Sequence, residues 1–143
     1  MDTHARHSMG MQKVGGIAAL YTAVAYLAAI PYFLVLVNYP SVVDPVQKVI
    51  LLRDNYASMY LMHVLSFEFV ALGLIIVTLA LHQRLKELAP STTQFATVVG
   101  LVRAGLLLAS VMVFNYGMGS VVRLYAINPD QACLLYTSDA ADE

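Results

Sequence analysis

Two ionisable residues, Glu68 and Arg103, interrupt long apolar stretches of this 143-residue chain. A charge near the centre of a lipid bilayer costs between ~3 and more than ~10 kcal/mol, so such residues usually pair with each other or face water. If the second and third apolar stretches form an antiparallel helical hairpin, the numbers of two residues at equal depth sum to about 175. Position 107 is then level with Glu68, and Arg103 lies about four residues, or ~6 Å, from that depth. We therefore predict an intramembrane ion pair between Glu68 and Arg103.

Three roles are open for these two residues. The ion pair can lock two helices together, which is the interpretation we favour. Glu68 can instead handle protons or a substrate. As a third possibility, Arg103 extends toward the membrane interface while Glu68 stays protonated.

His63 and Asn115 form a second candidate pair. The same register places Asn115 within about one helical turn of the depth of His63. We expect an interhelical hydrogen bond between His63 and Asn115, or between Tyr60 and Asn115. No second histidine or carboxylate follows His63 at the third or fourth position, so the spacing does not indicate a metal site.

One side of the last apolar stretch carries small and polar residues. These residues recur at spacings of three and seven, which places them on one helix face: Gly100, Arg103, Ser110 and Gly117. Small and polar residues of membrane helices normally face other helices. We expect this face to pack against another span, and we interpret it as a helix contact in preference to a substrate path.

The composition excludes several classes of protein. Hydrophobic residues make up 59% of the chain and charged residues 12%, with a mean hydropathy of +0.70. The formal net charge is -1, so there is no basic excess for nucleic-acid binding. The sequence contains no glycine-rich phosphate loop, Ser-His-Asp set or acidic metal cluster. We expect no enzyme activity and no cofactor or metal, and we expect the lipid bilayer to be the main partner.

Three apolar runs position these residues: 14–37, 57–81 and 95–122. The first alone makes ~36 Å of helix, enough to cross a hydrocarbon core of ~30 Å. None alternates with a period of two, as strands of a membrane barrel would. The predicted fold is therefore an all-α, polytopic transmembrane bundle with three spans. Pro31 predicts a kink in the first of them.

The connecting segments predict an orientation. Residues 1–13 form a polar N-terminus, and Asp44 followed by Pro45 and Gln47 indicates a helix start in the first loop. That short helix lies on the membrane surface or merely leads into the second span. With the N-terminus inside, basic residues number four inside (Arg6, Lys13, Arg84 and Lys86) and three outside (Lys48, Arg53 and Arg123). We expect a multi-pass protein of the cell membrane with a cytoplasmic N-terminus.

Residues 133–143 differ from the rest of the chain. Their sequence, CLLYTSDAADE, resembles a translated sequencing adapter, and we exclude it from the fold as an artefactual tail. Without its three acids, eight basic residues exceed the six remaining acids by two. We expect the transmembrane domain to cover 14–132 and the natural chain to continue beyond it.

Three segments resemble a family of bacterial multi-pass membrane proteins that is known as a domain of unknown function (the 4386 family). They are QKVGGIAAL at 12–20, DPVQKV at 44–49 and LALHQRLK at 79–86. The resemblance covers about 13–132. It implies a polytopic helical protein of the bacterial inner membrane, with further spans after the Asn128-Pro129-Asp130 turn. It implies no activity and no catalytic residues.

We therefore predict an integral membrane protein without a catalytic site in this stretch of chain. A first alternative is a component of a small-molecule or ion transporter or channel that uses Glu68 and Arg103. A second is a membrane assembly or interaction subunit, either a homo-oligomer or a partner of missing C-terminal spans. A third is a membrane enzyme whose polar residues are completed by those spans.

Overall fold

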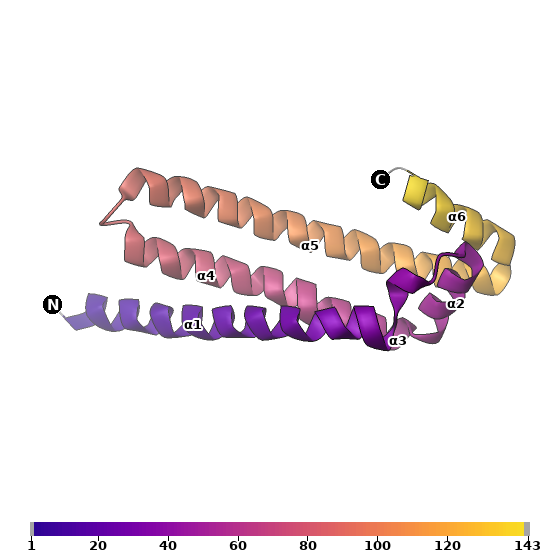
Figure 1. Ribbon diagram of the computed structural model, residues 1–143. Coiled ribbons are helices and arrows are strands. Elements are labelled where there is room, and N and C mark those ends of the chain that lie inside the picture. Colours follow the sequence, from indigo (N-terminus) through magenta and orange to yellow (C-terminus); the bar gives the residue numbers. More distant parts are fainter. Residues whose placement is uncertain (1, 142–143) are drawn as a thin grey trace.

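The computed structural model describes the backbone of residues 2–141 and the side chains of residues 10–135. The chain is all-α, and the described residues contain no strand (Figure 1). In chain order the helices are α1 (Asp2–Pro31), α2 (Pro45–Asp54), α3 (Tyr56–His63), α4 (Phe69–Leu85), α5 (Pro90–Ile127) and α6 (Pro129–Ala141). Three short segments have other helical geometry: η1 (Tyr32–Leu36), η2 (Tyr39–Ser41) and η3 (Val64–Glu68).

The three predicted spans are confirmed as helices. Helices long and apolar enough to cross a membrane cover Gly10–Leu36, Tyr56–Leu85 and Pro90–Ile127. The second and third extend past both ends of their apolar runs, and the first begins before its run and ends at Leu36, because helical geometry continues into the polar flanks. The polar N-terminus, for example, belongs to α1, which begins at Asp2.

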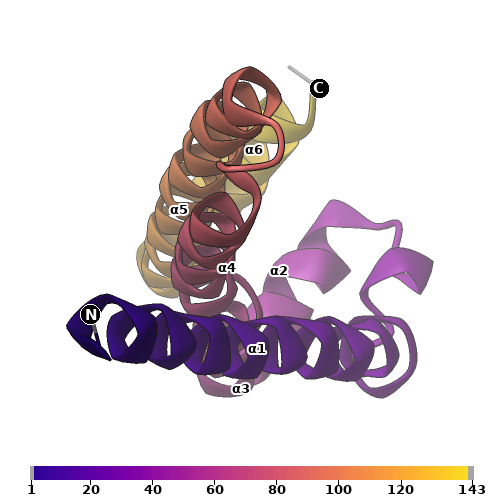
Figure 2. The ribbon, with the colours of Figure 1, turned by 90° about the vertical axis from the view of Figure 1, so that its left-hand side faces the viewer.

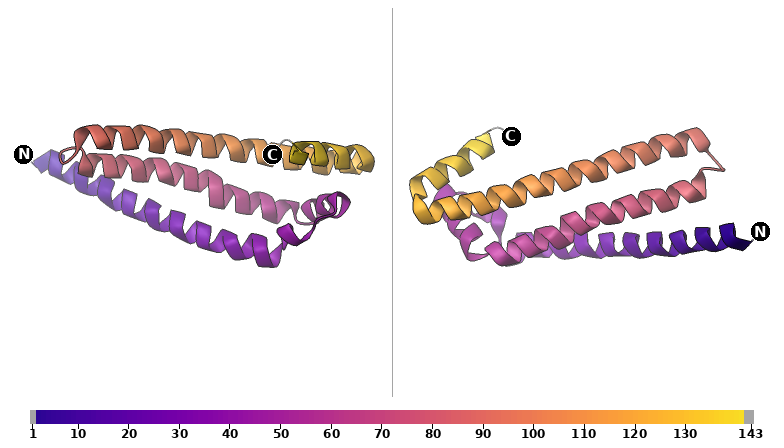
Figure 3. Two further views of the ribbon diagram at one scale, coloured as in Figure 1. Left: turned by 45° about the horizontal axis from the view of Figure 1, so that its top comes forward. Right: turned by 180° about the vertical axis from the view of Figure 1, so that it is seen from behind.

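Helix α4 lies between the other two long helices. It packs against α1 on one side and against α5 on the other. Figures 2 and 3 show α1 crossing α4 at an angle, whereas α5 runs antiparallel to α4 along most of its length. A larger share of the second span is buried, 28% against 11% for each of the others. The outer surfaces of α1 and α5 therefore remain open to the surroundings of the bundle.

Small residues bring the long helices together. A side-chain carbon added to Gly15 would collide with the Cβ of Ala80, and one added to Gly73 would lie 3.1 Å from Thr22 Oγ1. Between α4 and α5, Gly100 packs in the same way against Thr78. Close backbone approach maximises van der Waals contact, which is the main attraction between helices in a membrane.

Two spans contain a π-helical segment. After Pro31 the chain forms η1, in which the Val37 N–H donates to the Tyr32 carbonyl oxygen at 2.9 Å. The second segment, η3, interrupts the span that begins at Tyr56. Its Leu65 carbonyl oxygen accepts a hydrogen bond from the Tyr21 hydroxyl of α1. Such segments shift the side chains that follow them around the helix axis.

Helix α2 begins where the sequence predicts. The Asp44 carboxylate accepts a hydrogen bond from the Gln47 N–H at 3.1 Å, and Pro45 occupies the first position. Val49 and Leu52 are buried, and α2 packs against α5 and α6 at one end of the bundle. Part of its apolar side therefore faces protein, whereas Val46 remains exposed.

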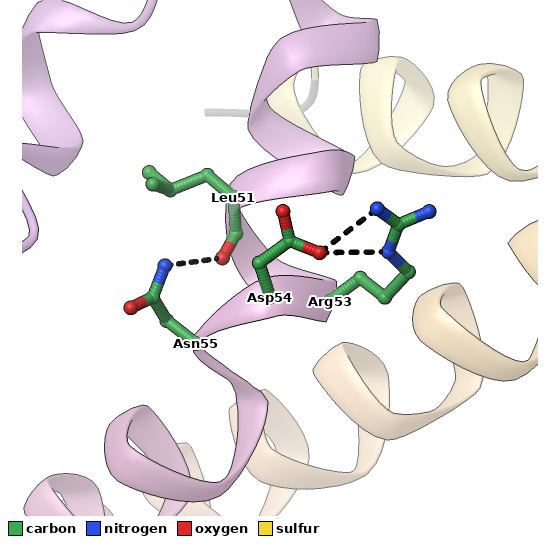
Figure 4. Close-up of polar contacts among 4 residues, drawn as sticks. All are labelled: Leu51, Arg53, Asp54 and Asn55. Carbon is green, nitrogen blue, oxygen red and sulfur yellow. Dashed lines mark hydrogen bonds and ion pairs between the residues drawn. The ribbon is translucent and has the colours of Figure 1, made fainter.

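A turn at Asn55 separates α2 from α3, so α2 is a helix of its own. The Asn55 side-chain amide donates to the Leu51 carbonyl oxygen at 3.0 Å. Beside it, Arg53 and Asp54 form an exposed ion pair with a shortest distance of 2.8 Å (Figure 4). An exposed pair of this kind contributes little to stability.

The contact between Gly15 and Ala80 predicts different effects for two neighbouring substitutions. Gly15→Ala should destabilise the bundle by about 1–3 kcal/mol, because the added methyl group overpacks the contact between α1 and α4. Gly16→Ala is the matched control, since nothing lies within 4 Å of its added carbon. It should be neutral or stabilising. Unfolding in a graded detergent titration measures both, and equal effects would contradict the packing described here.

Candidate functional site

Glu68 and Asn115 form the polar contact inside the bundle. Glu68 is the last residue of η3 and is half-buried, whereas Asn115 lies on α5 and is only 7% exposed. The Asn115 side-chain amide donates a hydrogen bond to Glu68 Oε1 at 3.1 Å. A polar group in hydrocarbon needs such a partner, because no water is available to replace it.

The structure does not bring Arg103 to Glu68. Arg103 lies on α5 twelve positions before Asn115, which is about 18 Å along the helix axis. Its side chain is exposed, and among the side chains of residues 10–135 the ion pair is the one between Arg53 and Asp54. Glu68 is thus satisfied by an amide, and Arg103 is left on the outside of the bundle.

The observed register of the hairpin differs from the predicted one. The prediction placed Glu68 level with about position 107, whereas the hydrogen bond places it opposite Asn115. A continuous α-helix was assumed in that estimate. Contacts nearer the loop are shifted in the same direction, since Thr78 meets Gly100 and His82 meets Thr97. The π-helical segment from Val64 to Glu68 also rotates Glu68 relative to the rest of the span. The sequence carries no signal for this change of helix type.

His63 lies in an aromatic environment. The rings of Phe114, Phe33 and Phe67 have centroids 4.4, 5.2 and 5.4 Å from its own. Its side chain also lies beside Asn115. The Asn115 carbonyl oxygen is buried and has no other hydrogen-bond partner among the described residues. The structure therefore brings His63 and Asn115 together as the sequence predicts, while the Asn115 amide nitrogen binds Glu68.

Tyrosines contribute contacts that the sequence analysis missed. The Tyr60 ring lies against Tyr56, with centroids 6.1 Å apart, and does not form the alternative contact with Asn115. Tyr21 instead contributes to the site, since its hydroxyl binds the carbonyl oxygen of Leu65 within η3. Tyr21 lies in the middle of the first span, and its position in the sequence does not indicate which carbonyl oxygen its hydroxyl binds.

The predicted small and polar face of α5 is divided by the fold. Gly100 contacts Thr78 of α4, whereas Arg103 and Ser110 are exposed on the outer side of the helix. The contact with α4 thus uses only part of the face, and Arg103 lies on the part that faces outward.

The chemistry of the site is that of a helix contact. The described residues contain no group of three histidine, cysteine or carboxylate side chains that could hold a metal ion. Glu68 has a single amide partner and His63 is surrounded by rings. The arrangement holds η3, and with it the second span, against α5 through one hydrogen bond between side chains.

A double-mutant cycle tests this arrangement. The pair Glu68→Leu and Asn115→Leu should couple by about 0.5–2 kcal/mol, because either single change leaves a polar group without its partner in hydrocarbon. The pair Glu68→Leu and Arg103→Leu is the control and should be additive within about 0.5 kcal/mol. Reversible unfolding in detergent micelles measures both cycles. A larger coupling of Glu68 to Arg103 than to Asn115 would restore the original ion-pair prediction.

Comparison of the chain with protein-family models, with curated protein sequences and with solved structures finds no match. The resemblance to the 4386 family therefore stays a prediction, and the function must be inferred from the geometry described above.

Proposed function

We propose that this chain is a non-enzymatic, membrane-embedded helical module that assembles with a further transmembrane helix through the outer face of α5. The observation that carries the proposal is Arg103, a charged side chain exposed within a span and without a polar partner among the described residues. An unpaired charge in hydrocarbon is costly, and a partner helix removes that cost by supplying an opposite charge.

The surroundings of Arg103 fit a helix contact. Leu106, Ser110 and Val113 lie on the same side of α5, at three, seven and ten positions after Arg103. All three are exposed. A small hydroxyl residue between two apolar ones lets another helix approach closely and offers it a hydrogen bond.

The partner must carry an acidic residue at the depth of Arg103. A second copy of the chain does not supply one, because Glu68 is the acid within the described spans and lies about 18 Å from that depth. A symmetric dimer through this face would also place two Arg103 side chains together. We therefore infer that the partner is a different helix, such as a further span of a longer chain.

The same geometry favours assembly over transport. A transport role for Glu68 would require its carboxylate to face a water-filled path. Instead, Glu68 is bonded to Asn115 between two helices, and Arg103 is on the outer face. Each residue is accounted for by helix packing.

The orientation and the membrane belong to the proposal as well. Lys13, Arg84 and Lys86 are exposed at one end of the bundle. An excess of basic residues favours the cytoplasmic side. We propose that this end, with the N-terminus, is cytoplasmic, and that the membrane is the bacterial inner membrane, as the resemblance implies.

Site-specific photo-crosslinking in native membranes tests the proposed partner. A photoreactive residue in place of Leu106 should form one discrete protein adduct, whose transmembrane segment contains an Asp or Glu. Leu20 on α1 is the matched control, since both side chains are 67% exposed. Arg103→Leu should reduce the adduct about tenfold, the effect of losing ~1.4 kcal/mol of binding, whereas Arg103→Lys should retain part of it.

Two results would contradict this function. An adduct yield that Arg103→Leu leaves unchanged would show that Arg103 does not hold a partner. Lipid adducts alone at Leu106 would show that this face meets the bilayer and that Arg103 extends to the headgroups.

A further inference from the structure

An apolar groove lies between α4 and α5 at the end where their loop joins them. It has a volume of about 290 Å³ and opens at the surface of the bundle. Leu81, Leu85 and Leu88 line it from α4 and the loop, and Ala96 lines it from α5. Sites for whole small molecules measure ~300–1,000 Å³. This groove is therefore suited to part of a long, thin apolar ligand.

The polar atoms of the groove bind one another. The Thr97 hydroxyl donates its one hydrogen to the Thr93 carbonyl oxygen at 2.7 Å. The same hydroxyl oxygen therefore accepts a hydrogen bond from Nδ1 of His82, which is 2.8 Å away. These bonds leave the lining predominantly apolar. An apolar chain can then occupy the groove without leaving a buried polar group unpaired.

Basic residues lie at the same end of the bundle as the groove. Arg84 and Lys86 flank the lining residue Leu85, and both are exposed. Lys13 lies at the same end, because its neighbour Gln12 donates to the Ala80 carbonyl oxygen of α4 at 3.0 Å. The acid in this loop is Glu87, which is outnumbered by the three basic groups.

The first turn of α5 offers further donors beside these residues. Its N-cap residue, Ala89, forms no side-chain cap, and the turn contains no acidic residue. Uncapped N–H groups at a helix start attract an anion. The apolar lining of the groove therefore suits an apolar chain, and the donors near the groove suit an anionic head. One molecule that has both parts would use the whole site.

We propose that this groove binds one acyl chain of an anionic phospholipid, with its phosphate held by Arg84, Lys86 and the first turn of α5. A soluble phosphate would use only the head of this site and leave the groove empty. The proposal is independent of the assembly role. Arg103 lies two turns beyond Ala96, about 10 Å deeper, and belongs to the other site.

Native mass spectrometry of the full chain, released from nanodiscs with equal phosphatidylglycerol and phosphatidylcholine, tests the proposal. The wild type should retain phosphatidylglycerol about tenfold more than phosphatidylcholine, because basic side chains near the headgroup favour an anionic lipid. Replacing Arg84 and Lys86 by Gln should abolish this preference. The matched control replaces Lys48 and Arg53 by Gln at the opposite end of the bundle and should retain it.

A second set of variants separates the groove from general charge attraction. Ala96→Phe and Thr92→Phe place a ring in the groove, and both should remove the bound lipid. Both positions are exposed, so the fold should tolerate them. Ala109→Phe, at another exposed position of α5, is the control and should leave lipid binding unchanged.

Three outcomes would overturn the proposal. They are equal retention of the two lipids by the wild type, unchanged binding in both groove variants, and displacement of the lipid by inorganic phosphate alone. The second would mean that the basic residues attract lipid from the surface without a groove. The third would mean that the site holds a phosphate and not an acyl chain.

Discussion

The hydrocarbon core of a membrane cannot form hydrogen bonds with a peptide group, and every part of this structure depends on that constraint. It requires each span to satisfy its own backbone, so the three apolar runs are helical almost throughout. Where the α-helical pattern changes, other bonds replace it. Val37 bonds across the wider turn that follows Pro31, and the Tyr21 hydroxyl binds a carbonyl oxygen within η3.

The same medium determines how the helices associate. Lipid tails are as apolar as leucine, so hydrophobic burial provides no force between spans. The bundle instead relies on small residues, with Gly15 against Ala80 and Gly100 against Thr78, and on the hydrogen bond between Glu68 and Asn115. Arg103, which has no polar partner among the side chains of residues 10–135, remains on the surface. The proposed assembly role is based on Arg103, and the proposed lipid binding is based on the open groove between α4 and α5.

The sequence predicted the features that depend on composition and short-range order. The three spans follow from apolar length, and the start of α2 follows from Asp44 and Pro45. The partner of Glu68 was not predictable, because neither the shift between α4 and α5 nor the π-helical turn of η3 has a signal in the sequence. Arg103 could be recognised as unusual in its span, but only the packing of α4 and α5 shows that it faces outward. Contacts between side chains of different helices depend on how each helix is rotated about its own axis, and composition does not determine that rotation.

The central claim is that each of the three long helices crosses the bilayer. Single cysteines at Val43, Lys86 and Leu106, in a Cys133→Ser background, test it with a membrane-impermeant maleimide applied to either face. The account predicts that positions 43 and 86 react from opposite faces and that position 106 reacts from neither. Reaction of 43 and 86 from the same face, or of 106 from any face, would contradict it.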